Sequence, residues 1–424
     1  MQTKDFFKCQ TTLGKLDNCG FLSTYLDDFA DWLSKQSFAW NTVGRHLTNI
    51  AHFSHYLKQG QPPNLESLNP HFDIFLYEHI PNCHCVGWNK VRKSKRVSLS
   101  LNRFKKYLTD CHGINFENNS FAYSAIHDEY LLWLSRYQGL TKSTIKSRSN
   151  YLRQFLEWYS DESASEDLKG TKADDVERFF LEATSKWGRA YKLSLQATLR
   201  SFFDFCYDRE HTPQNLRSSI PTIMTYRLSS VPKAIEDNEA LKLLKSIDRS
   251  KKSGIRNYAI LLLLFTYGVR GGQISALKLK DINWHKEEIC FPALKGGKHS
   301  LDPLTAETGN ALLDYLQNVR GKSHHQEVFL TLRAPLSPMK NSDSLSRAIR
   351  TEMLSAGVQS PSMGAHCFRH GFVSRMLKQG ESLKKIADLI GHKHIQTTFI
   401  YTKIDFKSLA EVALELPEVE NENN

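Results

Sequence analysis

Four side chains in the second half of the chain have types and spacing that suit chemistry on a phosphate. His366 and Arg369 stand three residues apart in a stretch of helical periodicity, so they share one face of a helix. The planar guanidinium groups of Arg270 and Arg369 could each bind non-bridging oxygens of a phosphate. Together they would neutralise the charge of a pentacoordinate transition state. A tyrosine hydroxyl has a reference pKa of about 10, so Tyr401 needs a cationic pocket or a base before it can attack at neutral pH. Tyr401 is the candidate nucleophile and His366 the candidate base.

Two further side chains could complete such a reaction. Residues 288–293 and 300–304 read as the strands of a hairpin that flank Lys295-Gly296-Gly297-Lys298. A lysine on this hairpin could protonate a leaving oxygen, and His392 could add a hydrogen bond to the phosphate. The Gly-Gly-Lys segment lacks the earlier glycine and the following hydroxyl of a phosphate loop. We therefore expect no ATP, no other cofactor and no metal.

The order and spacing of these residues resemble the tyrosine recombinase (phage integrase) family. His-Cys-Phe-Arg-His at 366–370, Ile-Gly-His at 390–392 and the tyrosine at 401 look like the family's late motif. Thr-Tyr-Gly-Val-Arg at 266–270 is similar to its first arginine motif, and residues 295–298 to its hairpin lysine segment. The resemblance is strong over residues 231–407 and looser over 122–210. It implies a catalytic set of Arg270, Lys295, His366, Arg369, His392 and Tyr401, with Lys295 chosen over Lys298 because the family's lysine precedes the turn.

This resemblance implies a site-specific DNA recombinase or integrase that cleaves and rejoins strands through a 3′-phosphotyrosyl intermediate, for integration or excision of a mobile element. The expected partner is double-stranded DNA, bound by a homotetramer on two synapsed sites that exchange strands through a Holliday junction. Sister recombinases or DNA-bending accessory proteins could also take part. Two alternatives stay open: an accessory DNA-binding subunit with a weakened active site, and a type IB topoisomerase-like activity without synapsis.

Three features depart from the family's pattern. Gln273 stands where a glutamate one helical turn beyond the first arginine is usual. An amide accepts fewer hydrogen bonds than a carboxylate and carries no charge, so we expect the guanidinium of Arg270 to be held less firmly. Gly371 replaces a small hydroxyl residue. An additional helical module precedes the part that a minimal member possesses.

That module arises from an internal duplication. Apolar residues recur at helical spacing in two copies of about 90 residues, with Phe53 and Phe104 of the first equivalent to Phe155 and Phe202 of the second. The predicted fold is mainly α: tandem helical (SAM-like) DNA-binding modules and a mostly helical catalytic domain with a small antiparallel sheet. The predicted parts are an N-terminal module (1–115), a core-binding domain (122–212), a linker (213–231), a catalytic domain (232–415) and an acidic tail (416–424).

Basic residues in both modules predict contacts with DNA phosphates, although a solvated loop would also explain the run at 90–96. The expected contacts are Lys90, Arg92, Lys93, Lys95 and Arg96 in the first copy and Lys142, Lys146, Arg148 and Arg189 in the second.

Composition fits this prediction. The 424 residues carry 56 lysines and arginines against 45 acidic residues, a net charge of +11 that favours a polyanionic partner. No apolar run is long enough to span a bilayer, and the N-terminus lacks a signal core, so we expect a cytoplasmic protein on DNA. Eight scattered cysteines predict reduced thiols rather than a disulfide framework. Cys83-His84-Cys85 looks like a fragment of a metal site, but its nearest sequence partners, Cys111-His112, are distant, and we favour no metal.

Overall fold

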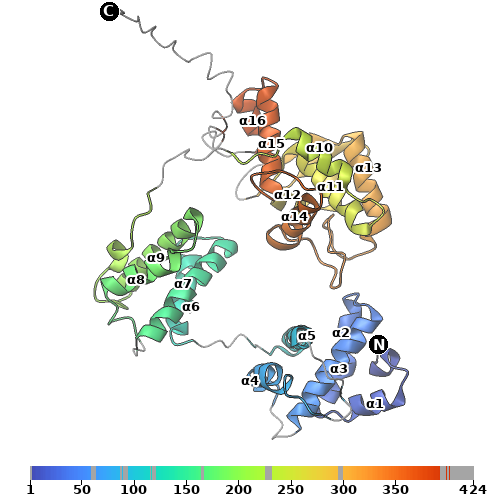
Figure 1. Cartoon of the computed structure of the whole chain (residues 1–424), viewed down its shortest axis with the longest axis vertical. Coiled ribbons are helices and arrows are strands. Elements are labelled where there is room, and N and C mark those ends of the chain that lie inside the picture. The colour runs from blue at the N-terminus through green and yellow to red at the C-terminus, as the bar shows by residue number, and fades with distance from the viewer. Residues whose placement is uncertain are drawn as a thin grey trace, which may run out of the picture. The chain divides into compact units, whose positions relative to one another are not determined.

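The computed structural model of the 424-residue chain describes most of its length. The described residues are 2–58, 64–85, 88, 94–114, 116, 121–163, 167–224, 232–294, 299–391, 398 and 401. Close contacts divide the chain into two compact units, Met1–Ile114 with Leu228–Asn424, and Asn115–Arg227. Figure 1 colours the N-terminal helices blue, the middle unit green and the C-terminal part yellow to red.

The N-terminal part is a group of helices packed through aromatic side chains. Phe29, Phe53 and Phe104 are fully buried, one on each of three helices that pack on each other. The helices are α1 (Gln10–Asp17), α2 (Leu26–Lys35), α3 (Trp40–Leu57), α4 (Leu68–Ile74) and α5 (Ser94–His112), with 3-10 turns η1 (Thr3–Phe6) and η2 (Phe21–Tyr25) and a π-helical turn η3 (Phe75–His79) that continues α4.

The middle unit also consists of four main helices: α6 (Ser124–Arg136), α7 (Lys142–Glu162), α8 (Ala173–Thr184) and α9 (Arg189–Asp208). α7 begins after Thr141, whose hydroxyl accepts a hydrogen bond from the backbone N–H of Thr144 at 3.4 Å. Phe155 and Phe202 are fully buried, as are their predicted equivalents in the first copy. Equivalent positions of the two copies therefore fill the centres of their own cores.

The segment after α9 differs from the predicted linker. Leu216–Ser219 form a 3-10 turn, η4, that packs against α8 and α9, and Leu216 and Ile220 belong to the middle core. Arg200 of α9 donates a hydrogen bond to the Ile220 carbonyl at 2.9 Å. Prolines and serines interrupt the helical periodicity here, but the apolar residues between them still reach the core. Residues 225–231 of the predicted linker lie outside the described residues, as does the predicted tail.

The C-terminal part is built around α11 (Lys252–Tyr267). Residues 259–264 are all buried because α11 packs against helices on several sides, which explains an apolar run without amphipathic spacing. None of the described helices is both long and apolar enough to cross a membrane. The neighbouring helices are α10 (Asp237–Ser246), α12 (Gly271–Ala276), α13 (Ala306–Tyr315), α14 (Ser346–Ser355), α15 (Ala365–Lys378) and α16 (Leu383–Leu389), with short turns η5 (Leu279–Asp281), η6 (Leu316–Arg320) and η7 (Asn341–Leu345).

Residues 321–340 interrupt the helices of the predicted, mostly helical catalytic domain. That stretch is irregular, with isolated antiparallel bridges from Lys278 to Glu327 and from Leu330 to Pro338. Its two prolines have no N–H to donate to a helix, which explains the interruption.

A small sheet completes the C-terminal part. Strands β1 (Ile282–Asn283), β2 (Glu288–Phe291) and β3 (Ser300–Pro303) pair antiparallel in that order, with Phe291 opposite Ser300. Tyr267 of α11 anchors the sheet, because its hydroxyl donates to the Pro303 carbonyl at 2.8 Å. The predicted hairpin is confirmed, and so is the mainly α fold with a small antiparallel sheet.

Candidate active site

Arg270 and Arg369 are held by adjacent carbonyls that follow α16. Arg369, on α15, is 4% exposed and donates hydrogen bonds to the carbonyls of Gly268 (3.0 Å) and Ile390 (2.6 Å). Arg270, the residue before α12, donates to the Gly391 carbonyl at 3.5 Å. The structure thus brings together two arginines that are 99 positions apart in the chain (369 − 270).

The electrostatics of this pair favour an anion. Burial lowers the pKa of Arg369 to about 10, and the positive charge of Arg270 contributes to the decrease. Burial also lowers the pKa of Arg270. Both groups stay cationic at neutral pH, and the ionisable neighbours that act on Arg369 are Arg270 and Tyr401, neither of them a carboxylate. A phosphate bound between the two guanidinium groups would offset the repulsion between their positive charges.

Gly268 allows this arrangement. Its φ of 58° lies in the left-handed region and ends α11, which turns its carbonyl toward Arg369. A Cβ at this position would lie 2.5 Å from the ring of Phe372 on α15. Only glycine at position 268 can both adopt this positive φ without strain and leave room for Phe372 of α15.

Tyr401 is buried beside the arginines and hydrogen-bonded to a histidine. It is 2% exposed and packs with Val373, Ile386 and Ile390. Its hydroxyl lies 2.6 Å from Nδ1 of His370. Burial raises the pKa of Tyr401 to about 12, although the charges of Arg369 and Arg270 act in the opposite direction. A hydroxyl with this pKa needs a proton acceptor to react at neutral pH, and the nearest one observed is His370.

This differs from the prediction that His366 is the base. His366 is exposed on α15, one turn before His370, and the two ring centroids are 6.5 Å apart. The sequence contained a signal for His370: it lies next to Arg369 and four residues from His366, on the same helix face. Which of the two histidines projects toward the tyrosine is decided by the packing of residue 401 onto α15.

Gln273 bonds the main chain of Arg270 rather than its guanidinium. Its side-chain oxygen accepts from the backbone N–H of Arg270 at 3.0 Å, and its amide donates to the Pro292 carbonyl at 3.2 Å. Gln273 is 5% exposed. It therefore caps the start of α12 and joins α12 to the end of β2, so it positions Arg270 through the main chain.

Gly371 is explained by close packing. A Cβ at residue 371 would lie 2.8 Å from the carbonyl oxygen of Ile235. The backbone N–H of Ile235 also donates to the Cys367 carbonyl at 3.2 Å, so this segment lies directly on α15. Glycine at position 371 therefore allows the segment around Ile235, which precedes α10, to pack directly on α15, the helix that carries Arg369.

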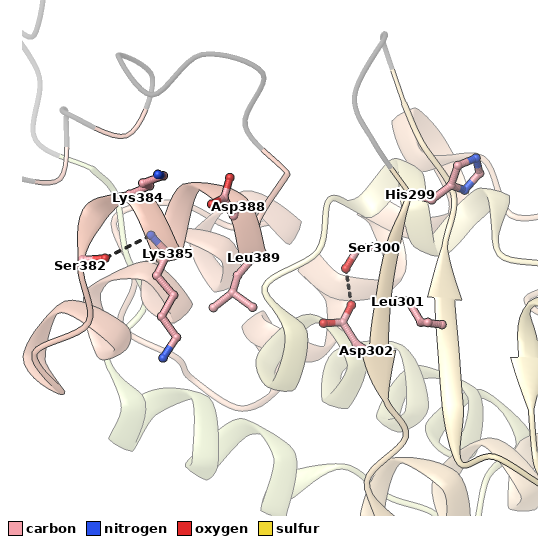
Figure 2. Close-up of a pocket in the computed structure, with 9 residues that line it drawn as sticks. All are labelled: His299, Ser300, Leu301, Asp302, Ser382, Lys384, Lys385, Asp388 and Leu389. Atoms are coloured by element: carbon pink, nitrogen blue, oxygen red, sulfur yellow. Dashed lines mark hydrogen bonds between the residues drawn. The ribbon is translucent and has the colours of Figure 1, made fainter.

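Lys295 and His392 lie outside the described residues, but the elements that flank them border one cleft. The cleft has a volume of about 520 Å³ and lies between β3 and α16. Figure 2 shows Lys384, Lys385 and Asp388 on one wall and His299 and Asp302 on the other. In sequence, residues 295–298 directly precede the lining residue His299, and residues 390–391 directly follow the lining residue Leu389. Arg270, Arg369 and Tyr401 do not line this cleft.

The basic residues predicted to contact DNA have different environments. Lys95, Arg96, Lys142, Lys146 and Arg189 are exposed. Arg148 is half-buried and donates to the hydroxyl of Ser201 on α9 at 3.0 Å, so it also joins α7 to α9. Lys90, Arg92 and Lys93 lie outside the described residues.

Known recombinases resemble this chain in sequence, one of them over nearly its whole length. It matches the phage integrase family over residues 233–408. The protein y4rA of Sinorhizobium fredii, named as an integrase/recombinase, is 30% identical over 400 residues, covering 94% of this chain and 95% of that protein. Tyrosine recombinase XerA of Pyrococcus furiosus is 28% identical over 290 residues, covering 68% of this chain and 92% of that protein.

Among solved structures, the XerH site-specific recombinase bound to a palindromic difH substrate, in a post-cleavage complex, has a TM-score of 0.54 at 19% identity and covers 82% of this chain and 97% of that one. A lambda integrase tetramer bound to a Holliday junction has a TM-score of 0.50 at 16% identity and covers 72% and 86%. These two share the fold of this chain. The nearly full-length similarity to y4rA, with the family match over residues 233–408, shows that the chain belongs to the phage integrase family of tyrosine recombinases. It is a tyrosine-type site-specific DNA recombinase, as the sequence predicted.

Proposed function

We propose that this recombinase integrates or excises a mobile DNA element, with Tyr401 as the nucleophile. The observation that carries the assignment is the Tyr401 hydroxyl, buried next to Arg270 and Arg369 and 2.6 Å from Nδ1 of His370. A nucleophile, a proton acceptor and two phosphate-binding forks are the groups that cleavage of a phosphodiester requires.

In the proposed reaction the scissile phosphate lies between the two guanidinium groups, which bind its non-bridging oxygens. The Tyr401 oxygen forms a bond to phosphorus as its proton moves to Nδ1 of His370. The bond from phosphorus to the 5′ oxygen breaks, and Lys295 supplies the proton that this oxygen needs. His392 donates a hydrogen bond to the phosphate, and His366 lies one turn from His370, where it can exchange the proton with solvent. The product is a 3′-phosphotyrosyl link.

The reverse reaction joins the strands without external energy. The link keeps the free energy of the phosphodiester. A 5′ hydroxyl of another strand can therefore attack the phosphorus as its proton moves to the neutral amine of Lys295, and the bond from phosphorus to the Tyr401 oxygen breaks. Protonated His370 then returns its proton to the tyrosine oxygen. No nucleotide cofactor enters this scheme.

Four protomers on two synapsed sites would exchange strands in pairs. The support is similarity: the lambda integrase structure that shares this fold is a tetramer bound to a Holliday junction. Sister recombinases or DNA-bending proteins could assist the assembly. The N-terminal part and the middle unit, each with exposed basic residues, are the proposed DNA-binding modules that accompany the catalytic domain.

Covalent trapping tests the proposal. Bound duplexes are first selected from a random library and from the DNA that flanks the gene, and a nicked version then serves as a suicide substrate. We expect a protein–DNA adduct that maps to Tyr401 and disappears in Tyr401→Phe, while DNA binding persists. Tyr137→Phe is the matched control, because Tyr137 is 71% exposed. An adduct at another tyrosine would overturn the assignment, and relaxation of supercoiled DNA at random sites would favour a topoisomerase.

A further inference from the structure

Two histidines and two cysteines of the N-terminal part converge on one point. His52 lies on α3, His79 ends the π-helical turn η3, and Cys83 and Cys85 follow it in the chain. One ligand atom from each side chain, an imidazole nitrogen or a thiol sulfur, lies within 4.8 Å of all the others. Both cysteines are free thiols.

The distances match those of a tetrahedral metal site. Nε2 of His52 lies 3.5 Å from Nε2 of His79 and 3.3 Å from Sγ of Cys83, and Sγ of Cys85 lies 3.6 Å from Nε2 of His79. With Zn–S of about 2.3 Å and Zn–N of about 2.05 Å, a tetrahedron requires N–N of about 3.4 Å and S–N of about 3.6 Å. These three distances already agree with a tetrahedron, and the remaining distances between ligand atoms are no longer than 4.8 Å.

The surrounding residues fix the two imidazole rings. Trp88 stacks on His52 with ring centroids 5.3 Å apart and planes 8° apart, and Phe75 stacks on His79 at 5.2 Å and 15°. In the π turn the backbone N–H of Ile80 donates to the Phe75 carbonyl, an i to i+5 bond that adds one residue to the turn carrying His79. Local backbone geometry and ring stacking thus both orient the ligand nitrogens.

The sequence could not have identified this set. It offered Cys111-His112 as the nearest partners of the Cys-His-Cys fragment, but His112 bonds the Tyr107 hydroxyl at 2.9 Å. The middle residue of the fragment, His84, is exposed and is not among the four converging residues. The histidines that do converge come from α3 and η3, and only the packing of these elements brings them to the cysteines.

We propose that His52, His79, Cys83 and Cys85 bind one Zn²⁺ ion. Two thiolates and two imidazoles in a tetrahedron suit zinc better than the oxygen-preferring Mg²⁺ or Ca²⁺. Four protein ligands leave no open position, so the site is structural: binding displaces the two thiol protons and fastens the chain at Cys83 and Cys85 to α3.

The test uses the full-length protein, purified under reducing conditions without added metal. We expect one zinc per chain by elemental analysis, released when a mercurial reagent blocks the thiols. After removal of zinc, titration with Co²⁺ should give the intense d–d bands of a tetrahedral ion together with a thiolate-to-cobalt charge-transfer band, saturating at one equivalent. A chain that retains no stoichiometric zinc and gives only the weak spectrum of octahedral Co²⁺ overturns the proposal.

Variants assign the ligands. Cys83→Ser and Cys85→Ser should each reduce bound zinc about tenfold or more, whereas Cys111→Ser and His84→Ala should retain it. Cys85→His keeps four ligands, so it should retain metal with about half of the charge-transfer intensity, which separates loss of a thiolate from loss of folding. Equal loss of zinc from Cys111→Ser and Cys83→Ser, or an undiminished charge-transfer band in Cys85→His, would refute the assignment.

Discussion

Replacing His370 by alanine tests the contact between this residue and Tyr401. The substitution removes the Nδ1 acceptor that lies 2.6 Å from the tyrosine hydroxyl. It leaves a hydroxyl that is 2% exposed without this partner. DNA binding should persist, because Arg270 and Arg369 are unchanged.

The expected loss of rate follows from the acidity of Tyr401. Its pKa is raised to about 12, so only about one molecule in 10⁵ carries the phenolate at pH 7. A positioned base avoids that requirement by accepting the proton as the bond to phosphorus forms, an effect of about 10²- to 10⁴-fold. His370→Ala should therefore slow single-turnover cleavage by that factor, equivalent to about 3 to 5 kcal/mol in activation free energy.

The pH profile distinguishes loss of a base from loss of structure. Burial and the charges of His366 and Arg369 lower the pKa of His370 below its ordinary value of 6.5, so it is neutral and able to accept a proton at pH 7. In the parent protein the cleavage rate should rise as pH increases through the His370 pKa and then level off. In His370→Ala the rate should instead increase about tenfold per pH unit through neutrality, because the tyrosine must ionise by itself.

Two variants complete the experiment. His370→Asn retains an oxygen acceptor but takes up no proton, so it should keep the tyrosine in place and still lack the plateau. His366→Ala should retain the plateau. If His366→Ala loses it and His370→Ala keeps the parent profile, the base is His366, and the inference from the 2.6 Å contact is refuted.

The other predictions concern residues that hold the site and bind DNA. Gln273→Glu replaces a buried amide donor with a carboxylate that faces a carbonyl oxygen, so we expect a loss of about 1 kcal/mol in unfolding free energy, smaller at acidic pH where the glutamic acid can donate; unchanged urea unfolding at both pH values would contradict this. Gly371→Ala forces a Cβ against backbone and should destabilise by about 1–3 kcal/mol. Gly14→Ala, inside α1 with open space around its Cβ, should be neutral or slightly stabilising in the same measurement. Neutralising Lys95 and Arg96 together should reduce the slope of log affinity against log salt by up to about 1.8, and an unchanged slope would mean that neither contacts phosphate.

The sequence by itself determined the class of protein. Reactive residue types at a fixed separation, such as His366 and Arg369 on one helix, form a local pattern that can be recognised in the sequence alone. Helical periodicity likewise predicted the two aromatic cores, because burial repeats with the turn of the helix.

Tertiary structure decided which of several suitable groups meet. His366 and His370 lie on one face of α15, and only the packing of residue 401 places its hydroxyl against His370. Gln273 could have bonded the side chain or the main chain of Arg270, and the position of the Pro292 carbonyl selected the main chain. His52 and Cys83 are 31 positions apart (83 − 52) with no periodic relation, so their 3.3 Å contact follows from the packing of α3 against the chain beyond η3. Spacing along a chain constrains neighbours within a few helical turns, whereas contacts between elements depend on how whole cores pack.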